Sequence, residues 1–333
     1  IAVNLLGSTL FLFALATIYS LTGTLNMADL AAKLPVLPEG DHGLMRAAAV
    51  MLMLVFAIKG ALVPLHFWLP GTYAQAPGVV AALFAVMTKV GAYAALRFGT
   101  LVFPTDLAVT GPLIADLMLP AGLITLTLGS IGILGARSLP RLAAYAALAS
   151  MGTVFTALSA FTPASTTATL YYMAHSTLAG GLLFLVTDLA RARGGEFLDG
   201  PDRPRLSGRL GVLFFLAAIA TAGLPPLSGF PGKLMVLQSA SGPMALVWPV
   251  VLGGGFLALI GLSRAGSALF WAPQGEAMAP LPLSQAIAPA LLLAGLVALT
   301  LGAGPVQDWL ATTAAALHNP APYILANDLP GGA

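Results

Sequence analysis

The sequence contains no cysteine and few charged residues. Because Cys is 0 among 333 residues, disulfides, thiolate zinc sites and iron–sulfur clusters are excluded. Only 8% of the residues are charged and the formal net charge is +2, whereas a soluble domain carries about 25% charged residues. So few charges cannot cover a surface in water. The basic residues are also not clustered with aromatic residues, so we expect no nucleic acid partner.

Hydrophobic residues make up 58% of the chain and dominate its organisation. A helix that crosses a bilayer needs roughly 20 mostly apolar residues, and the alternating pattern of a membrane β-barrel is absent. Nine apolar runs meet this requirement: about 1–22, 44–70, 77–103, 111–136, 139–160, 166–190, 209–240, 244–271 and 284–304. We therefore predict an all-α, polytopic protein that crosses the lipid bilayer with about nine transmembrane helices.

Basic residues are concentrated in one set of alternating loops. That set holds Arg137, Arg141, Arg191, Arg193, Arg203, Arg205, Arg209 and Arg264, and the other set holds only Lys33, Arg46 and Arg97. Cytoplasmic loops carry the excess of Lys and Arg. The sequence therefore predicts a cytoplasmic Arg-rich side and a C-terminus on the outer side, with Arg264 and Asp188 interpreted as charges at the membrane interface.

Five ionisable side chains remain inside or near the apolar runs: Lys59, His66, Lys89, His175 and Lys233. A charge at mid-membrane costs about 2.5–3.5 kcal/mol on insertion scales, so its presence indicates a function. Desolvated lysine can release its proton, and histidine titrates near neutrality. These residues are therefore candidates for a proton relay.

Each candidate also has a structural interpretation. A lysine can extend to the interface, although the central position of Lys59 in its run argues against this. Lys233 can serve a helix break, and His175 can be an interior histidine bonded to a carbonyl. His66 lies near the cytoplasmic end of its run, where it either opens the proton path or only packs.

Two runs contain residues that break a helix. Lys59 is followed by Gly60 and Pro64, and the stretch from Gly223 to Lys233 contains Pro225, Pro226, Gly229 and Pro231. Proline removes a helical hydrogen bond, so neither run can be one straight helix. The broken runs are the second and the seventh, so they cross the membrane in opposite directions. Interrupted spans of opposite orientation are typical of transporters with inverted repeats.

Several motifs carry a family resemblance. They are Pro64-Leu-His-Phe-Trp-Leu-Pro70, Tyr73-Ala-Gln-Ala-Pro77, Met87-Thr-Lys-Val-Gly-Ala-Tyr93, Leu170-Tyr-Tyr-Met-Ala-His-Ser-Thr-Leu178 and the stretch from Gly223 to Lys233. Together they resemble the proton-conducting antiporter family, which contains the Mrp/Pha cation/proton antiporter subunits and the antiporter-like membrane subunits of respiratory complex I. Ser263-Arg-Ala-Gly-Ser267 and Asn319-Pro-Ala-Pro-Tyr323 are more similar to the MrpD/PhaD type of antiporter protein.

The resemblance implies a fold and a set of roles. The family has fourteen spans with two inverted five-span repeats, and the nine runs would be spans six to fourteen. Residues 1–103 would then be the C-terminal part of the first repeat, with three spans. Residues 104–272 would be the second repeat, with five spans, and 273–333 the last span and tail. Lys59, Lys89, His175 and Lys233 would form the hydrophilic axis that carries protons laterally.

Two departures from the family pattern affect this expectation. The chain opens with Ile1 inside an apolar run, so we expect a fragment without the family's span-five glutamate, the usual partner of the lysine at Lys59. Such a fragment alone is not expected to transport, unless a carboxylate comes from another protein of the complex. The run 139–160 also offers only Tyr145 and Ser150 as interior polar candidates, so a relay there needs water, hydroxyls or His175.

The favoured hypothesis is a proton-conducting subunit coupled to Na⁺/H⁺ or K⁺/H⁺ antiport in a multi-subunit Mrp/Pha-type complex of the bacterial inner (plasma) membrane. The alternative is a proton-pumping subunit of an NADH–quinone oxidoreductase-type complex, and a third possibility is a membrane scaffold without transport. We expect no catalytic residue, cofactor or metal site, since no redox or phosphate-binding motif is present. The chain is thus predicted to be a transporter subunit and not an enzyme.

Overall fold

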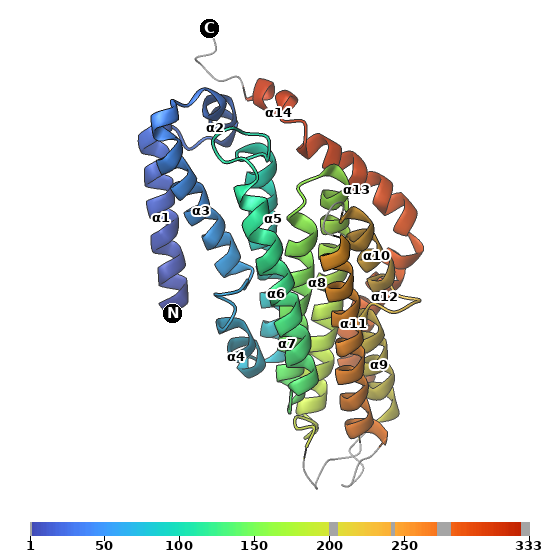
Figure 1. The fold of residues 1–333 in the computed structure, drawn as a ribbon. Helices are drawn as coiled ribbons and strands as arrows, with labels where there is room; N and C mark the ends of the chain where they lie inside the picture. Colours follow the sequence, from blue (N-terminus) through green and yellow to red (C-terminus); the bar gives the residue numbers. More distant parts are fainter. Residues whose placement is uncertain (1, 200–205, 241–243, 272–280, 328–333) are drawn as a thin grey trace.

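A computed structural model describes residues 2–199, 206–240, 244–271 and 281–327. These segments form a bundle of helices that lie side by side (Figure 1). The α-helices are α1 (Ala2–Thr22), α2 (Met27–Lys33), α3 (His42–Lys59), α4 (Trp68–Gln75), α5 (Gly78–Leu101), α6 (Leu113–Gly135), α7 (Leu139–Leu158), α8 (Pro163–Arg191), α9 (Gly208–Ala222), α10 (Gly229–Ser239), α11 (Met244–Gly266), α12 (Leu283–Leu301), α13 (Ala303–Leu317) and α14 (Ala321–Ala326).

The described helices correspond to the nine predicted runs. Eight of them, in the described part of the chain, are long and apolar enough to cross a membrane. The remaining run, 209–240, is divided between α9 and α10. No β-strand occurs in the described ranges, where Ser138 and Phe197 form an isolated bridge. The prediction of an all-α polytopic membrane protein is confirmed.

Helix α7 lies at the centre of the bundle and packs closely on α6. Of its apolar window, 83% is buried, against 17% for α1 and 11% for α12. Glycines allow the close approach, because a Cβ added at Gly152 would lie 2.3 Å from the Leu126 nitrogen and one at Gly129 would lie 2.5 Å from the Ala149 nitrogen. Small residues at helix interfaces are typical of membrane bundles. The interior is thus built around α7 and its neighbours.

Both predicted broken spans are interrupted. The first half-helix α3 ends at Lys59, and α4 begins at Trp68. In the other broken span, α9 ends at Ala222, and Gly223 adopts a left-handed φ of 80° that a residue with a side chain rarely accepts.

The proline and glycine positions divide between loop and helix. Gly60 and Pro64 lie in the first interruption, and Pro225 and Pro226 lie in the second. Gly229 is the first residue of α10, and Pro231 lies in its first turn, where the missing N–H has no helical partner to lose.

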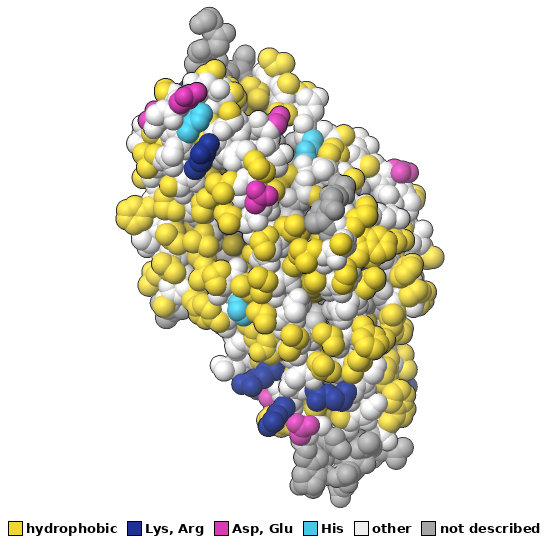
Figure 2. Space-filling view, in the orientation of Figure 1, with side chains coloured by type: hydrophobic (Ala, Val, Ile, Leu, Met, Phe, Trp, Pro, Cys, Tyr) yellow, Lys and Arg dark blue, Asp and Glu magenta, His cyan; other side chains and the backbone are white. Residues whose placement is uncertain are grey.

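The two broken spans run in opposite directions through the bundle. Arg209 near the start of α9, Arg141 near the start of α7 and Arg191 at the end of α8 lie at one end of the molecule, and α4 lies toward that end (Figure 1). Figure 2 shows most of the visible Lys and Arg side chains near this end, below a broad apolar surface. Arg203 and Arg205 lie outside the described residues.

The C-terminal helices run along the outside of the bundle (Figure 1). Helix α13 packs on α8, and His318 at its end lies 2.9 Å from the Thr166 hydroxyl through Nε2. Helix α14 reaches the opposite side of the molecule near α2, where the Arg97 guanidinium lies 4.5 Å from the centre of the Tyr323 ring. These contacts tie the C-terminal segment to both sides of the bundle.

Candidate functional site

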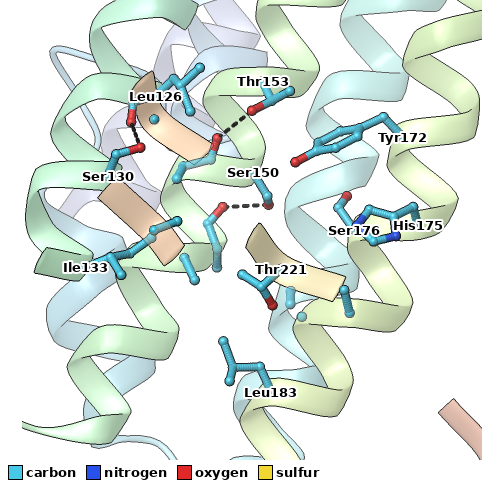
Figure 3. A pocket seen from close by; sticks show the side chains of 18 of the residues that line it. Leu126, Ser130, Ile133, Ser150, Thr153, Tyr172, His175, Ser176, Leu183 and Thr221 are labelled. Atoms are coloured by element: carbon cyan, nitrogen blue, oxygen red, sulfur yellow. Dashed lines mark hydrogen bonds between the residues drawn. The ribbon is translucent and has the colours of Figure 1, made fainter. Parts of the chain in front are cut away.

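A central cavity of about 40 Å³ lies among helices α5 to α11. Figure 3 shows side chains from several helices directed toward it. Besides apolar residues, its lining includes Lys89, Ser130, Ser150, Thr153, Tyr172, His175, Ser176, Thr221 and Lys233. A polar cavity needs about 10–15 Å³ by this kind of measure to hold one water molecule. The cavity therefore has room for a few waters among ionisable groups and hydroxyls.

Lys89 lies in the middle of α5 and is 5% exposed. Its Nζ donates to the Ser150 Oγ at 3.3 Å, and that hydroxyl donates to the Ala147 carbonyl at 2.8 Å. The ion pairs found among the described residues, Lys33–Asp29 and Arg191–Glu196, lie away from the cavity. Lys89 is therefore a buried amine whose described side-chain partner is a hydroxyl.

His175 lies on α8, is 2% exposed, and lines the same cavity as Lys89 and Lys233. Its Nδ1 is 2.9 Å from the Ser228 Oγ, and the Ala220 carbonyl is a further hydrogen-bond partner. Lys89 and Lys233 are both close enough to interact electrostatically with His175. The imidazole can therefore exchange protons with hydroxyls and waters, and the charge of both lysines influences its protonation.

Lys233 depends on the break between α9 and α10. Its Nζ donates to the Ala222 carbonyl at 2.6 Å, and Ala222 is the last residue of α9. The final carbonyls of a helix have no intrahelical partner and carry partial negative charge. The break therefore creates a site that favours an ammonium group within the bundle.

Lys59 lies in a different place. It is the last residue of α3, is exposed, and donates from Nζ to the Asn4 Oδ1 at 2.7 Å. It lines a wider cavity of about 580 Å³ with residues of α1, α4 and α5, including Thr88. The structure thus brings together Lys89, His175 and Lys233 but places Lys59 on the other side of α5.

His66 lies in the interruption between α3 and α4 and is half-buried. Its Nδ1 is buried without a hydrogen-bond partner. It is not among the residues that line the central cavity or the wider cavity at Lys59. The nearby Trp68 indole donates to the Ile58 carbonyl at 3.1 Å, so the end of α3 is capped by tryptophan instead.

The cavity contains hydroxyls beyond the predicted polar candidates. Of the two residues expected from the run 139–160, Ser150 contacts Lys89, whereas Tyr145 lies against Gly132 of α6. Thr153, Tyr172, Ser176 and Thr221 also line the cavity. Helical spacing could have identified some of them, because Thr153 follows Ser150 by three positions and Tyr172 precedes His175 by three.

Within the segments that the structure describes, no group of three or more His, Cys, Asp or Glu side chains is arranged to hold a metal ion. The chemistry of the central cavity is therefore that of amines, an imidazole and hydroxyls. Such groups bind and release protons.

Comparison with known proteins places this arrangement in a family. The model of the NADH:quinone oxidoreductase/Mrp antiporter transmembrane family matches residues 1–261. The chain is 34% identical to the D component of a probable K(+)/H(+) antiporter of Rhizobium meliloti (strain 1021) over 348 residues, which cover 94% of this chain and 64% of that protein. It is also 34% identical to the D component of the Na(+)/H(+) antiporter of Bacillus subtilis (strain 168), covering 97% of this chain and 66% of the relative. The chain thus spans slightly less than two thirds of the length of these curated relatives.

Solved structures show the same fold. A chain in the structure of the Mrp complex from Dietzia sp. DQ12-45-1b superposes with a TM-score of 0.87 at 25% identity, covering 98% of this chain and 68% of that one. A chain of respiratory complex I from Thermus thermophilus with bound NADH superposes with a TM-score of 0.80 at 27% identity, covering 94% and 67%. The family resemblance of the motifs is confirmed, and the chain belongs to the NADH:quinone oxidoreductase/Mrp antiporter family of multi-pass membrane proteins.

Proposed function

We propose that this chain conducts protons through Lys89, His175 and Lys233 as part of an antiporter-type membrane subunit. The observation that carries the proposal is the meeting of two lysines and a histidine in one polar cavity inside the bundle. Each charge placed at mid-membrane costs about 2.5–3.5 kcal/mol. Hydroxyls and water partly offset that cost and also supply the hydrogen bonds along which protons move.

The proposed relay follows the contacts of the cavity. A proton on Lys89 reaches the Ser150 hydroxyl directly, and waters in the cavity connect that hydroxyl to His175. His175 passes the proton to Lys233, whose ammonium form is stabilised by the Ala222 carbonyl. Positive charge on either lysine repels charge on His175, so each transfer favours release of the next proton. Lys59 would exchange protons with Lys89 past α5, and we keep His66 as a candidate for the opening of the path.

We further propose that proton movement is coupled to exchange of a monovalent cation, Na⁺ or K⁺, in a complex with other Mrp/Pha-type subunits. The similarity to the D components of two antiporters and to a chain of an Mrp complex supports this. The alternative, a proton-pumping subunit of a redox-driven complex, is supported by the TM-score of 0.80 with a chain of respiratory complex I.

The proposal includes an orientation and a repeat structure. We place the end that carries Arg141, Arg191 and Arg209 in the cytoplasm of a bacterial cell, because basic loops remain on that side of the inner membrane. We assign residues 1–103 to the first repeat and 104–272 to the second. The opposite directions of the two broken spans support this assignment.

The test uses the intact protein, purified with the subunits that accompany it and reconstituted in vesicles with an internal pH dye. Imposed Na⁺ or K⁺ gradients should drive proton movement in the wild type. Lys89→Ala and Lys233→Ala should each abolish it while assembly is unchanged. Lys33→Ala is the matched control, since Lys33 is exposed and paired with Asp29 at 3.0 Å.

Two results would contradict the proposal. If neither cation gradient moves protons in the wild type, the antiport coupling is wrong and the redox-driven alternative becomes the better account. If the wild type transports and both cavity variants retain its rate, the relay through the cavity is wrong.

A further inference from the structure

Ser228 begins helix α10 but does not cap it. Serine at this position normally accepts a hydrogen bond from a backbone N–H of the first turn. Here the Ser228 side chain makes no capping hydrogen bond. The residue is 0% exposed, so its hydroxyl also has no contact with solvent. A buried hydroxyl that does not bond to its own helix normally forms a hydrogen bond with another part of the protein.

That partner is His175 on α8. The Ser228 Oγ lies 2.9 Å from the His175 Nδ1. The same contact joins the interruption between α9 and α10 to the helix that carries the imidazole. Gly229, the next residue, lies so close that an added Cβ would meet the His175 Cε1 at 3.0 Å and the Ala220 carbonyl at 2.4 Å. The imidazole is thus held against the interruption itself.

We propose that Ser228 is a positioning residue for the relay, which holds the His175 ring in one orientation in both of its protonation states. The inference rests on the proposed function of His175. A neutral imidazole with its proton on Nε2 accepts at Nδ1, and the hydroxyl then donates. An imidazolium donates from both nitrogens, and the hydroxyl then accepts. Ser228 can therefore hold the ring in one orientation in both protonation states. A group that only donates, or only accepts, could bond to Nδ1 in just one of them.

The second nitrogen completes this arrangement. The Ala220 carbonyl lies beside the imidazole, since both would meet a Cβ added at Gly229, and a carbonyl accepts a hydrogen bond but cannot donate one. It therefore favours a proton on the nitrogen that it contacts, and Ser228 adapts at Nδ1. The titratable groups around His175 are Lys89 on α5, Lys233 on α10 and Tyr172 on α8 itself, whose ring centre is 5.6 Å away. Any pH dependence of the relay contains their contributions as well.

The test compares four variants of the intact protein in its complex: Ser228→Ala, Ser228→Thr, Ser239→Ala and His175→Gln. Ser239 is the matched control, because it is also a buried serine of α10 but donates to the Val236 carbonyl of its own helix. Proton movement in vesicles is measured from pH 5.5 to 9. The ring ¹⁵N signals of His175, identified by their loss in His175→Gln, report its tautomer.

Ser228→Ala should lower the transport rate roughly 2- to 10-fold, the effect of losing one hydrogen bond, displace the pH profile and alter the His175 ¹⁵N signals. Ser228→Thr should restore all three readouts, and Ser239→Ala should match the wild type. If Ser228→Ala does not assemble, Ser228→Cys, of similar size but a weak hydrogen-bonding group, should show the same three changes.

The outcomes separate the two proposals. If His175→Gln leaves transport intact, the proposed relay is wrong and the role of Ser228 falls with it. If His175→Gln abolishes transport but Ser228→Ala or Ser228→Cys leaves the pH profile and the ¹⁵N signals unchanged, the relay stands and the inference about Ser228 is overturned.

Discussion

Replacement of Lys89 by methionine tests whether the buried amine lowers the stability of the fold while it serves proton movement. Lys89 is 5% exposed, and its hydrogen bond to Ser150 is 3.3 Å long, just beyond the usual N–H···O range. Placing its charge at mid-membrane costs about 2.5–3.5 kcal/mol, and a hydrogen bond from a charged group returns about 1.5 kcal/mol at the lower end of its range. Methionine fills a similar volume without charge. Lys89→Met should therefore stabilise the fold by about 1–2 kcal/mol and abolish proton movement.

The assay is thermal unfolding of the purified complex in one detergent, with each variant compared to the wild type. At about 2 °C per kcal/mol for a chain of this size, the Tm should rise by about 2–4 °C. Lys33→Met is the control, because the exposed Lys33 pairs with Asp29 at 3.0 Å and gains little from removal of its charge. A lower Tm for Lys89→Met would refute the reasoning, since it would mean that the amine stabilises the fold more than its burial destabilises it.

Three further predictions concern packing and the C-terminal helices. Gly152→Ala should cost about 1–3 kcal/mol of stability by overpacking, because the added Cβ would lie 2.3 Å from a backbone atom. Gly253→Ala is the control and should be neutral, because nothing lies within 4 Å of its added Cβ. Equal Tm values for the two variants would contradict this prediction. Burial lowers the pKa of His318, so stability present above about pH 6.5 is lost on acidification. The protection of the α13 amides against hydrogen exchange, corrected for the intrinsic pH dependence of exchange, should therefore fall from pH 8 to 5, and His318→Gln should remove this fall. Tyr323→Leu should remove a cation–π contact of about 0.5–1 kcal/mol and speed proteolysis at α14 with transport unchanged; unaltered proteolysis would argue against that contact.

Hydrophobic runs and helix-breaking residues were sufficient to predict the fold. Nine runs correspond to the described helices because the bilayer requires continuous apolar segments of one length. Proline and glycine residues predicted both interruptions, because proline lacks the backbone N–H that a helix needs at that position. The family motifs could also be recognised from the sequence, because they occupy contiguous stretches of the chain.

The partners within the site could not be predicted in the same way. The family resemblance implies one axis through Lys59, Lys89, His175 and Lys233, which stays a prediction. The structure adds that the last three line one cavity and Lys59 lines another. The depth of an ionisable residue within a run does not reveal which helix faces it. Ser228 and His175 are 53 positions apart in the sequence, and their contact arises from packing between α8 and the start of α10.

The positions of Lys89 and its neighbour Thr88 determine which groups helix α5 presents to the cavities on its two sides. Consecutive residues of an α-helix point about 100° apart, and these two face different cavities on either side of α5. Helix α5 therefore separates a wide cavity from a narrow one, and Lys89 lies in the wall between them. Water in the wide cavity would therefore meet Thr88 and Lys59, whereas water in the narrow cavity would meet Lys89, His175 and Lys233.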